Sequence, residues 1–235
     1  MEKAKRYILT TRPLPKAIIE DAAAKNIVIE ELSFIDTTPV ASEAVVQRIK
    51  ELASQACAVV FTSMNAVEMV ATHIKEVKEW TVYCIGNTTK KLINEKLPSA
   101  VIAVTAENAE RLAEHIVDDK VKKAVFFCGN IRRDELPNKI RSEGGSVEEI
   151  VVYETVERPS ALSKEYEGIL FFSPSAVNSF FKINKVPSRT QLFAIGSTTA
   201  ETLRQFANRK IIVANSSGKQ ELAQQAIEYF HHQNP

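Results

Sequence analysis

The chain has 235 residues, of which 45% are hydrophobic and 25% are charged, with a formal net charge of +1. This length suits one large domain or two small ones, and the near-zero charge gives no overall field that would favour nucleic acid or an acidic membrane. Because no apolar run approaches the about 20 residues that span a bilayer, and the first run, Tyr7–Leu9, is too short for a secretory signal, we expect a cytoplasmic protein with no membrane or nucleic-acid partner.

Short apolar runs alternate with helical patterns from the N-terminus onward. The runs of the first half are rich in β-branched and aromatic residues and mostly continuous, which is typical of buried parallel strands. They are "RYILTT", "VIEELSF", "CAVVFTS", "TVYCIG" and "SAVIAVT". Between them the sequence predicts helices over Lys16–Lys25, Ser42–Ser54, Ala66–Ile74, Thr88–Glu95 and Asn108–Asp118. The second half repeats this alternation, which indicates an α/β fold with parallel sheets.

The two halves are copies of one pattern. "FTSMNAV" at residues 61–67 and "FFSPSAV" at residues 171–177 lie 110 positions apart, and Ile85–Gly86 matches Ile195–Gly196 at the same spacing. Earlier parts repeat at a spacing of 118, with "IEELSFIDTTP" matching "VEEIVVYETVERP". Each half therefore contains five strand units, and two similar five-stranded sheets fit this duplication better than one sheet of ten strands.

The domain boundary has two possible positions. The simple cut lies near Val121, between the repeats. Pro39 and Pro159 offer another, because they hold equivalent places in the repeat and follow long extended segments that suit crossovers better than helices. If the chain crosses there, the first two strands of each half belong to the other domain, and the residues alone leave both possibilities open.

Polar loops follow the strands at four equivalent places, "TSMNAV", "FSPSAV", "IGNTTKKLI" and "IGSTTAETL". In open parallel sheets ligands bind beyond the C-terminal ends of the strands, and free N–H groups at helix starts attract carboxylates and phosphates. Plain helix capping is the alternative for each loop by itself. Four equivalent loops favour a shared anion-binding cleft. The dinucleotide, P-loop and nucleophile-elbow motifs are absent, so nucleotide binding and hydrolase chemistry are not indicated.

Four larger side chains stand out near these loops. Arg12 follows the first strand, and Arg132 and Arg133 lie in the equivalent loop of the second copy, where a guanidinium suits a carboxylate. A solvated surface arginine is an equally good interpretation of each. Tyr153 ends "EEIVVY" at the second proposed crossover, where a half-buried strand aromatic is the commoner role and a catalytic phenol the rarer one.

The three cysteines, Cys57, Cys84 and Cys128, are widely spaced and lie in or beside apolar runs. This favours reduced, buried thiols over a disulfide framework or a metal site. The four histidines do not indicate a metal site either, because they are isolated or at the tail.

Seven short motifs, in their order along the whole chain, resemble the uroporphyrinogen-III synthase family. They are "LTTRP", "VFTSMNAV", "CIGNTTKKL", "FFCGNIRRDELPNKI", "VVYETV", "LFFSPSAVNSFF" and "FAIGSTTAETL". The resemblance implies two flavodoxin-like parallel-sheet domains with a crossed chain. One would comprise residues 1–36 and 157–235 and the other residues 38–154, joined by a two-stranded linker near residues 33–40 and 152–159.

The resemblance also implies an activity without cofactor or metal, the cyclisation of hydroxymethylbilane to uroporphyrinogen III. A spiro intermediate would rearrange so that ring D closes inverted. The expected protein is a monomer, with the preceding pathway enzyme as a candidate partner. A non-catalytic protein that binds or senses an anionic small molecule on the same scaffold is the alternative.

For the site, the resemblance implies a catalytic role for Tyr153, which would help the hydroxyl group leave. Thr89 and Thr199 match the family better than their neighbours, and only one of Arg132 and Arg133 is expected to correspond. Met64 stands where proline or a polar residue is common, which would change the shape of the loop. The implied substrate-binding residues are Arg12, Ser63, Asn65, Thr88, Thr89, Arg132, Arg133, Ser173, Ser175, Thr198 and Thr199.

Overall fold

The structure, a computed structural model, describes residues 5–215 and 218–232. Helices and strands alternate along these residues, and they form two compact α/β units. Unit 2 is one continuous segment, Thr37–Thr155, while unit 1 comprises the described residues before and after it. The chain therefore crosses from one unit to the other twice, after Asp36 and after Thr155.

Unit 1 contains a five-stranded sheet in which all four neighbouring pairs of strands are parallel. The strand order is β11-β10-β9-β1-β2, so the strands numbered along the unit run 2-1-3-4-5, the flavodoxin-like order. Its elements are β1 (Arg6–Thr10), α1 (Lys16–Ala24), β2 (Ile27–Glu31), β9 (Gly168–Phe171), α7 (Pro174–Phe181), β10 (Gln191–Ala194), α8 (Ser197–Phe206), β11 (Ile211–Val213) and α9 (Lys219–His232).

Unit 2 repeats this order with one additional strand. Its sheet reads β3-β8-β7-β4-β5-β6, so β7 takes the place of β1 and β8 the place of β2. Its elements are β3 (Ile35–Pro39), α2 (Glu43–Ala53), β4 (Cys57–Phe61), α3 (Met64–Ala71), β5 (Trp80–Ile85), α4 (Asn87–Lys96), β6 (Val101–Ala106), α5 (Ala109–Asp118), β7 (Lys123–Gly129), α6 (Glu135–Ser142) and β8 (Ser146–Glu157). The α/β fold with duplicated parallel sheets is thus confirmed.

The additional strand β3 comes from the segment that leads from unit 1 into unit 2. It lies beside β8, and the hydrogen bonds from the Val40 N–H to the Val152 carbonyl (3.0 Å) and from the Arg158 N–H to the Phe34 carbonyl (2.8 Å) give an antiparallel register. The sequence predicts five strands in each sheet. The sixth arises because the extended linker satisfies its backbone groups by pairing with β8.

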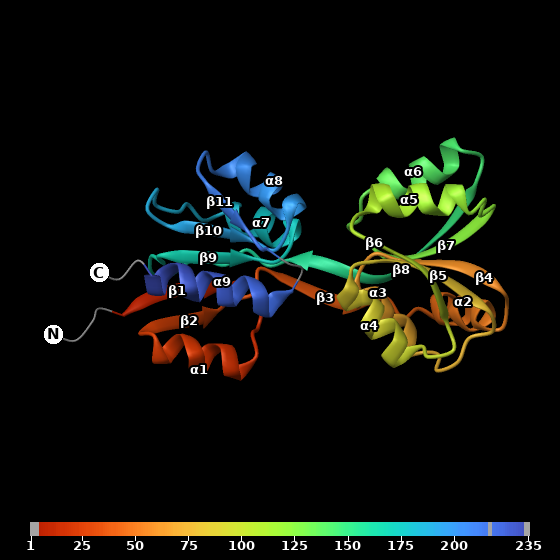
Figure 1. The fold of residues 1–235 in the computed structure, drawn as a ribbon, viewed down its shortest axis with the longest axis horizontal. Coiled ribbons are helices and arrows are strands. Elements are labelled where there is room, and N and C mark those ends of the chain that lie inside the picture. The colour runs from red at the N-terminus through yellow and green to blue at the C-terminus, as the bar shows by residue number, and fades with distance from the viewer. Residues whose placement is uncertain (1–4, 216–217, 233–235) are drawn as a thin grey trace. The chain divides into compact units, whose positions relative to one another are not determined.

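Helices cover both faces of each sheet, as Figure 1 shows. In unit 1, α7 and α8 pack on one face and α1 and α9 on the other, and the alternation along β9 follows these layers. Ile169 and Phe171 pack towards α7 and α8, whereas Leu170 packs towards α9. In unit 2, α2, α3 and α4 share one face, and α5 and α6 the other. Within the described residues, no helix has the length and apolar character needed to cross a membrane.

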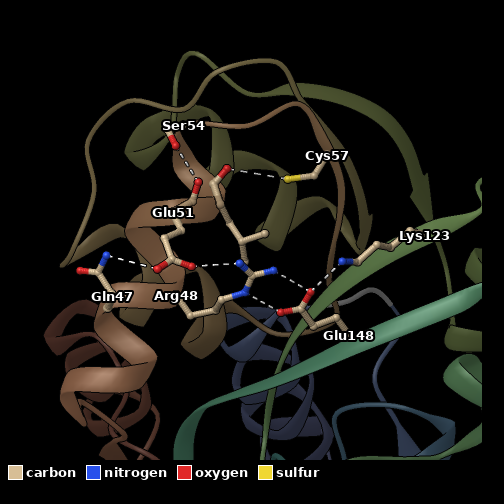
Figure 2. Close-up of polar contacts among 8 residues, drawn as sticks. Gln47, Arg48, Glu51, Ser54, Cys57, Lys123 and Glu148 are labelled. Carbon is tan, nitrogen blue, oxygen red and sulfur yellow. Dashed lines mark hydrogen bonds and ion pairs between the residues drawn. The ribbon is translucent and has the colours of Figure 1, made fainter.

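An ion pair joins the helix α2 to β8, the strand that carries Tyr153. Ser42 caps this helix by accepting from the Val45 N–H, and Arg48 projects from it towards β8 (Figure 2). The Arg48 guanidinium donates to both oxygens of Glu148, at 2.7 and 2.9 Å, and Lys123 lies 3.2 Å from the same carboxylate. These cations, Arg48 foremost, lower the pKa of Glu148 from its ordinary value. A bidentate ion pair therefore fixes β8 to the helix that precedes β4.

The cysteines are free thiols, as expected. Cys84 and Cys128 are buried and Cys57 is half-buried, so the expected burial holds fully for two of the three. Burial raises the pKa of both Cys57 and Cys128 to about 11, which leaves these thiols protonated and unreactive near neutral pH. In the part of the chain that the structure describes, no three His, Cys, Asp or Glu side chains gather as metal ligands.

Candidate functional site

The strand order of each unit reverses at one pair of neighbouring strands, β1 and β9 in unit 1 and β7 and β4 in unit 2. Ligands of open parallel sheets bind beyond the C-terminal ends of strands at such a switch point. The polar loops that the sequence singles out follow these strands and the adjacent β5 and β10. The topology therefore gathers the predicted loops of each unit at the same edge of its own sheet.

In unit 2 the structure brings two of the predicted residues into contact. The Tyr153 phenol lies 3.0 Å from the hydroxyl of Ser63, and either oxygen can be the donor. Ser63 also caps α3, because its Oγ accepts from the Ala66 N–H at 3.2 Å. Tyr153 is only 8% exposed, so its ring is anchored in the core while its hydroxyl meets the start of a helix.

A bulge in β8 sets the direction of the Tyr153 side chain. Cys128 pairs with Val151, but the next residue of β7, Gly129, pairs with Tyr153, so Val152 is an extra residue. Val152 and Tyr153 consequently pack in the same core cluster, whereas regular alternation would place Tyr153 on the opposite face with Val151. The bulge thus turns the phenol towards β4 and Ser63.

The ring of Tyr153 lies against Gly129, at the end of β7. A Cβ atom at this glycine would lie 2.5 Å from Cε2, 2.6 Å from Cζ and 3.0 Å from the phenol oxygen of Tyr153. The following residue, Asn130, donates its N–H to the Tyr153 carbonyl at 3.1 Å and accepts from the Thr155 N–H through Oδ1 at 2.8 Å. Sequence reasoning missed Gly129 and Asn130, although the 118-residue repeat places Asn130 opposite Arg12 and so marks the position.

The four loops differ in how they begin their helices. Ser63 and Ser173 cap α3 and α7, each accepting from an N–H three residues on at 3.2 Å, so capping is a real role of both. The helices α4 and α8 follow Gly86 and Gly196 and have no side-chain cap. Their first N–H groups are therefore not taken by a capping side chain and can serve an anion.

Only one of these two glycines is required by the backbone. Gly86 has a φ of 80°, a left-handed conformation that strains residues with a Cβ atom. Gly196 has a φ of −171°, an extended conformation that any residue adopts. The glycine in the second copy is thus not explained by backbone geometry, and no atom lies within 4 Å of a Cβ built there.

The threonines of these loops differ in exposure. Thr89 and Thr199, the better family matches, are buried with exposed fractions of 4% and 2%. Thr88 is exposed and Thr198 half-buried, because they lie one position earlier in the first helical turn. The structure therefore makes Thr88 and Thr198 the more accessible hydroxyls, while Asn65 and Ser175 are half-buried at the starts of α3 and α7.

The predicted arginines have different surroundings. Arg132 pairs with Glu149 and with Asp134, the latter at 2.7 Å, and Arg133 lies 3.4 Å from Glu135. Arg12 follows β1 and is half-buried, and none of the ion pairs found among the described residues involves it. An unneutralised guanidinium is better placed to take a carboxylate than one already held by two acids, so Arg12 is the strongest cation candidate.

The chain is similar to proteins of one known family. A family model described as "Uroporphyrinogen-III synthase HemD" matches residues 16–224. The uroporphyrinogen-III synthase of Saccharomyces cerevisiae (strain ATCC 204508 / S288c) is 28% identical over 153 residues, which cover 52% of this chain and 54% of the yeast protein. The chain spans about half the length of the curated relatives it matches, 45% and 54%.

Two solved structures share the fold. A mutant uroporphyrinogen III synthase of Thermus thermophilus superposes with a TM-score of 0.74 at 13% identity, covering 98% of this chain and 100% of that one. The uroporphyrinogen-III synthetase of Helicobacter pylori 26695 gives 0.65 at 17% identity, covering 95% and 99%. At these identities the likeness shows the fold alone, whereas the family model covers most of the sequence. The chain belongs to the uroporphyrinogen-III synthase family.

Proposed function

We propose that this protein is a uroporphyrinogen-III synthase, which cyclises hydroxymethylbilane to uroporphyrinogen III with inversion of ring D. The single observation that carries the proposal is the Tyr153 phenol, held 3.0 Å from Ser63 at the edge of the sheet where ligands bind. Membership of the family supplies the reaction class.

The reaction begins with loss of the terminal hydroxyl of ring A as water. The Tyr153 O–H donates to the departing oxygen, and the electrophile left behind attacks the substituted carbon of ring D to form a spiro intermediate. Rearrangement and closure then release one proton, which restores the phenol, so the net change is the loss of one water molecule. A phenol suits this step because it is a neutral donor near pH 7.

Ser63 supports the phenol in this role. Its Oγ accepts from the Ala66 N–H, and its own O–H can donate to the phenol oxygen. In that arrangement the phenol can donate its own proton to a ligand. The low exposure of Tyr153 keeps competing water away from this hydrogen bond.

Each unit offers polar groups that suit some of the eight carboxylates of a linear tetrapyrrole. Arg12 supplies a cation in unit 1, and the uncapped starts of α4 and α8 supply N–H donors. The proposed binding residues are Arg12, Ser63, Asn65, Thr88, Thr89, Arg132, Arg133, Ser173, Ser175, Thr198 and Thr199. Unit 1 and unit 2 are the two proposed domains. The protein is proposed to be a monomer in the cytoplasm. The preceding pathway enzyme is the candidate protein partner.

The decisive experiment incubates purified protein with freshly prepared hydroxymethylbilane and separates the product isomers. We expect the type III isomer in excess of the type I isomer that forms spontaneously. Formation of type I alone would refute the synthase, and saturable binding of the substrate without type III product would instead favour the binding or sensor protein.

The role of the phenol is tested by Tyr153→Phe, with Tyr83→Phe as the matched control. Tyr83 is also a buried phenol of unit 2, but it donates to Asp119 at 2.8 Å and packs on the opposite face of the sheet. We expect Tyr153→Phe to lower kcat about 100-fold, the usual contribution of a general acid, with a smaller change in KM. Tyr83→Phe should leave both unchanged, and equal turnover in all three proteins would remove Tyr153 from the mechanism.

A further inference from the structure

The strand β8 continues past the end of its partner β7. The last pairing of the two strands joins Gly129 with Tyr153, whereas β8 extends to Glu157. The bulge at Val152 immediately precedes this point. Tyr153 therefore lies where regular pairing with β7 stops and the ladder is already irregular. Beyond this point β3 pairs with one edge of β8, and the backbone groups on the edge that faces β7 need another partner.

Asn130 supplies this support. Its backbone N–H donates to the Tyr153 carbonyl at 3.1 Å, and its Oδ1 accepts from the N–H groups of Thr155 and Ile131, both at 2.8 Å. Its Nδ2 makes a longer bond to the Thr155 carbonyl at 3.4 Å. The carboxamide thus takes the place of a further peptide group of β7, and the two N–H donors fix which side of the amide is oxygen.

Gly129 supplies the space for the ring. Any side chain there would meet the phenol, since a Cβ atom would lie 3.0 Å from its oxygen and closer still to Cε2 and Cζ. Gly129 and Asn130 therefore act on the same residue from two sides, Gly129 on the ring of Tyr153 and Asn130 on its backbone.

The other copy of the repeat shows what happens where there is no such phenol. At a spacing of 118, Thr11 and Arg12 stand opposite Gly129 and Asn130, and the segment of that copy that corresponds to β8, residues 27–39, contains no tyrosine. Thr11 is buried and its hydroxyl donates to the Leu170 carbonyl at 3.0 Å, so a side chain fits there. The glycine and the asparagine occur together only in the copy that carries the tyrosine.

We propose that Asn130 is the positioning residue for Tyr153, holding the strand on the C-terminal side of the phenol so that its hydroxyl stays against Ser63. This inference rests on the proposed function of Tyr153. Asn130 acts through the backbone of β8 and takes no part in the chemistry itself. Its removal should therefore affect kcat more than KM, because a small displacement of a reacting group is costly.

The kinetic test compares Asn130→Ala and Asn130→Asp, each alone and combined with Tyr153→Phe. Asn130→Ala should lower kcat about tenfold or more, whereas Asn130→Asp keeps the accepting oxygen and should recover most of that loss. In the Tyr153→Phe background, Asn130→Ala should lower kcat by no more than about twofold, because the group that it positions is gone. An equal loss in both backgrounds, or a rise in KM with kcat unchanged, would overturn the proposal.

Asn184→Ala is the control for lost stability alone. Asn184 is a buried carboxamide of unit 1 that donates to the carbonyls of Ser160 and Phe180, at 2.8 and 2.9 Å, and accepts from the Leu162 N–H at 2.9 Å. Its removal should lower the melting temperature without lowering kcat at 25 °C. If Asn184→Ala lowers kcat as much as Asn130→Ala does, the effect is general destabilisation and the proposal fails.

Amide hydrogen exchange separates this proposal from the proposed activity, because it needs no substrate. In Asn130→Ala the Thr155 amide should exchange at least about tenfold faster than in the parent protein, and in Asn130→Asp close to the parent rate. Unchanged protection in Asn130→Ala overturns the positioning role whatever the enzyme assay shows. Suppose that the parent protein forms the type I isomer alone while the Thr155 amide exchanges as expected. This result refutes the proposed synthase activity, but it still establishes that Asn130 supports the backbone of β8.

Discussion

Gly129→Ala is the substitution for which the structure gives the sharpest expectation. The added methyl carbon would lie 2.5 Å from Cε2 and 2.6 Å from Cζ of Tyr153. Ordinary carbon–carbon contacts are about 3.5–4.0 Å, so the ring has to retreat by roughly 1 Å. The phenol oxygen lies 3.0 Å from the added carbon as well, and it moves with the ring.

This retreat has two measurable consequences. A movement of about 1 Å takes the phenol beyond hydrogen-bonding range of Ser63, from which it is now 3.0 Å away, and misplacement of that size costs about 100-fold in rate. Overpacking at a buried position also lowers the free energy of unfolding by about 1–3 kcal/mol. We therefore expect Gly129→Ala to lose about two orders of magnitude in the rate of type III isomer formation while it remains folded.

The assay pairs initial rates of type III formation with urea denaturation of the same samples. In a Tyr153→Ala background the added methyl group meets no ring, so Gly129→Ala should then cost almost no stability. The reasoning from this contact is refuted if Gly129→Ala keeps at least half of the parental kcat. It is also refuted if Gly129→Ala lowers the free energy of unfolding equally in the parent and in the Tyr153→Ala background.

Two further predictions concern stability. Gly168→Ala places a Cβ atom 2.6 Å from Cε2 of Phe230, so it should lower the free energy of unfolding by about 1–3 kcal/mol without lowering kcat, and Phe230→Leu should recover part of this loss in urea denaturation. If Gly168→Ala is as stable as the parent protein, α9 can move away from the added methyl group without cost, and the prediction is wrong. The lowered pKa of Glu148, caused chiefly by Arg48, contributes stability that is present above its unfolded pKa of about 4.5 and is lost as pH falls through the lower folded value. The stability difference between the parent and Glu148→Gln should therefore be about 1 kcal/mol at pH 7 and vanish in acid, and a difference that does not vary with pH contradicts this account.

The periodicity of the sequence predicts the class of fold, and the duplication predicts that the two sheets are alike. Parallel buried strands are apolar on both faces, so their continuous runs are visible without a structure. The resemblance of short motifs supplies the family. The strand β3 lies in the two-stranded linker that the resemblance implies near residues 33–40 and 152–159. That it also extends the sheet of unit 2 to six strands was not predicted, because the pairing of a linker depends on which strand edge it passes and not on its own residues.

The local geometry of the site is less visible in the sequence. Regular alternation along "EEIVVY" would turn Tyr153 to the wrong face, and the bulge at Val152 that corrects this leaves no residue signature. Thr89 and Thr199 match the family but are buried, because the orientation of a helix on its sheet decides which first-turn residue faces inward. Asn130 lacks the charge that draws attention to the arginines two and three residues on, although the repeat marks its position.

The double crossing of the chain sets the order in which the units can fold as the polypeptide is made. Unit 2 is continuous and can close as soon as Thr155 has emerged, but unit 1 contains β1 and β2 from one end of the chain and β9 to β11 from the other. The Tyr7 N–H and the Glu167 carboxylate, which meet at 2.8 Å, are 160 residues apart in sequence. Pairings of such long range form late. While unit 2 is being synthesised, β1 therefore lacks its partner strand β9, and its edge stays unpaired. The risk of aggregation is greatest during this interval.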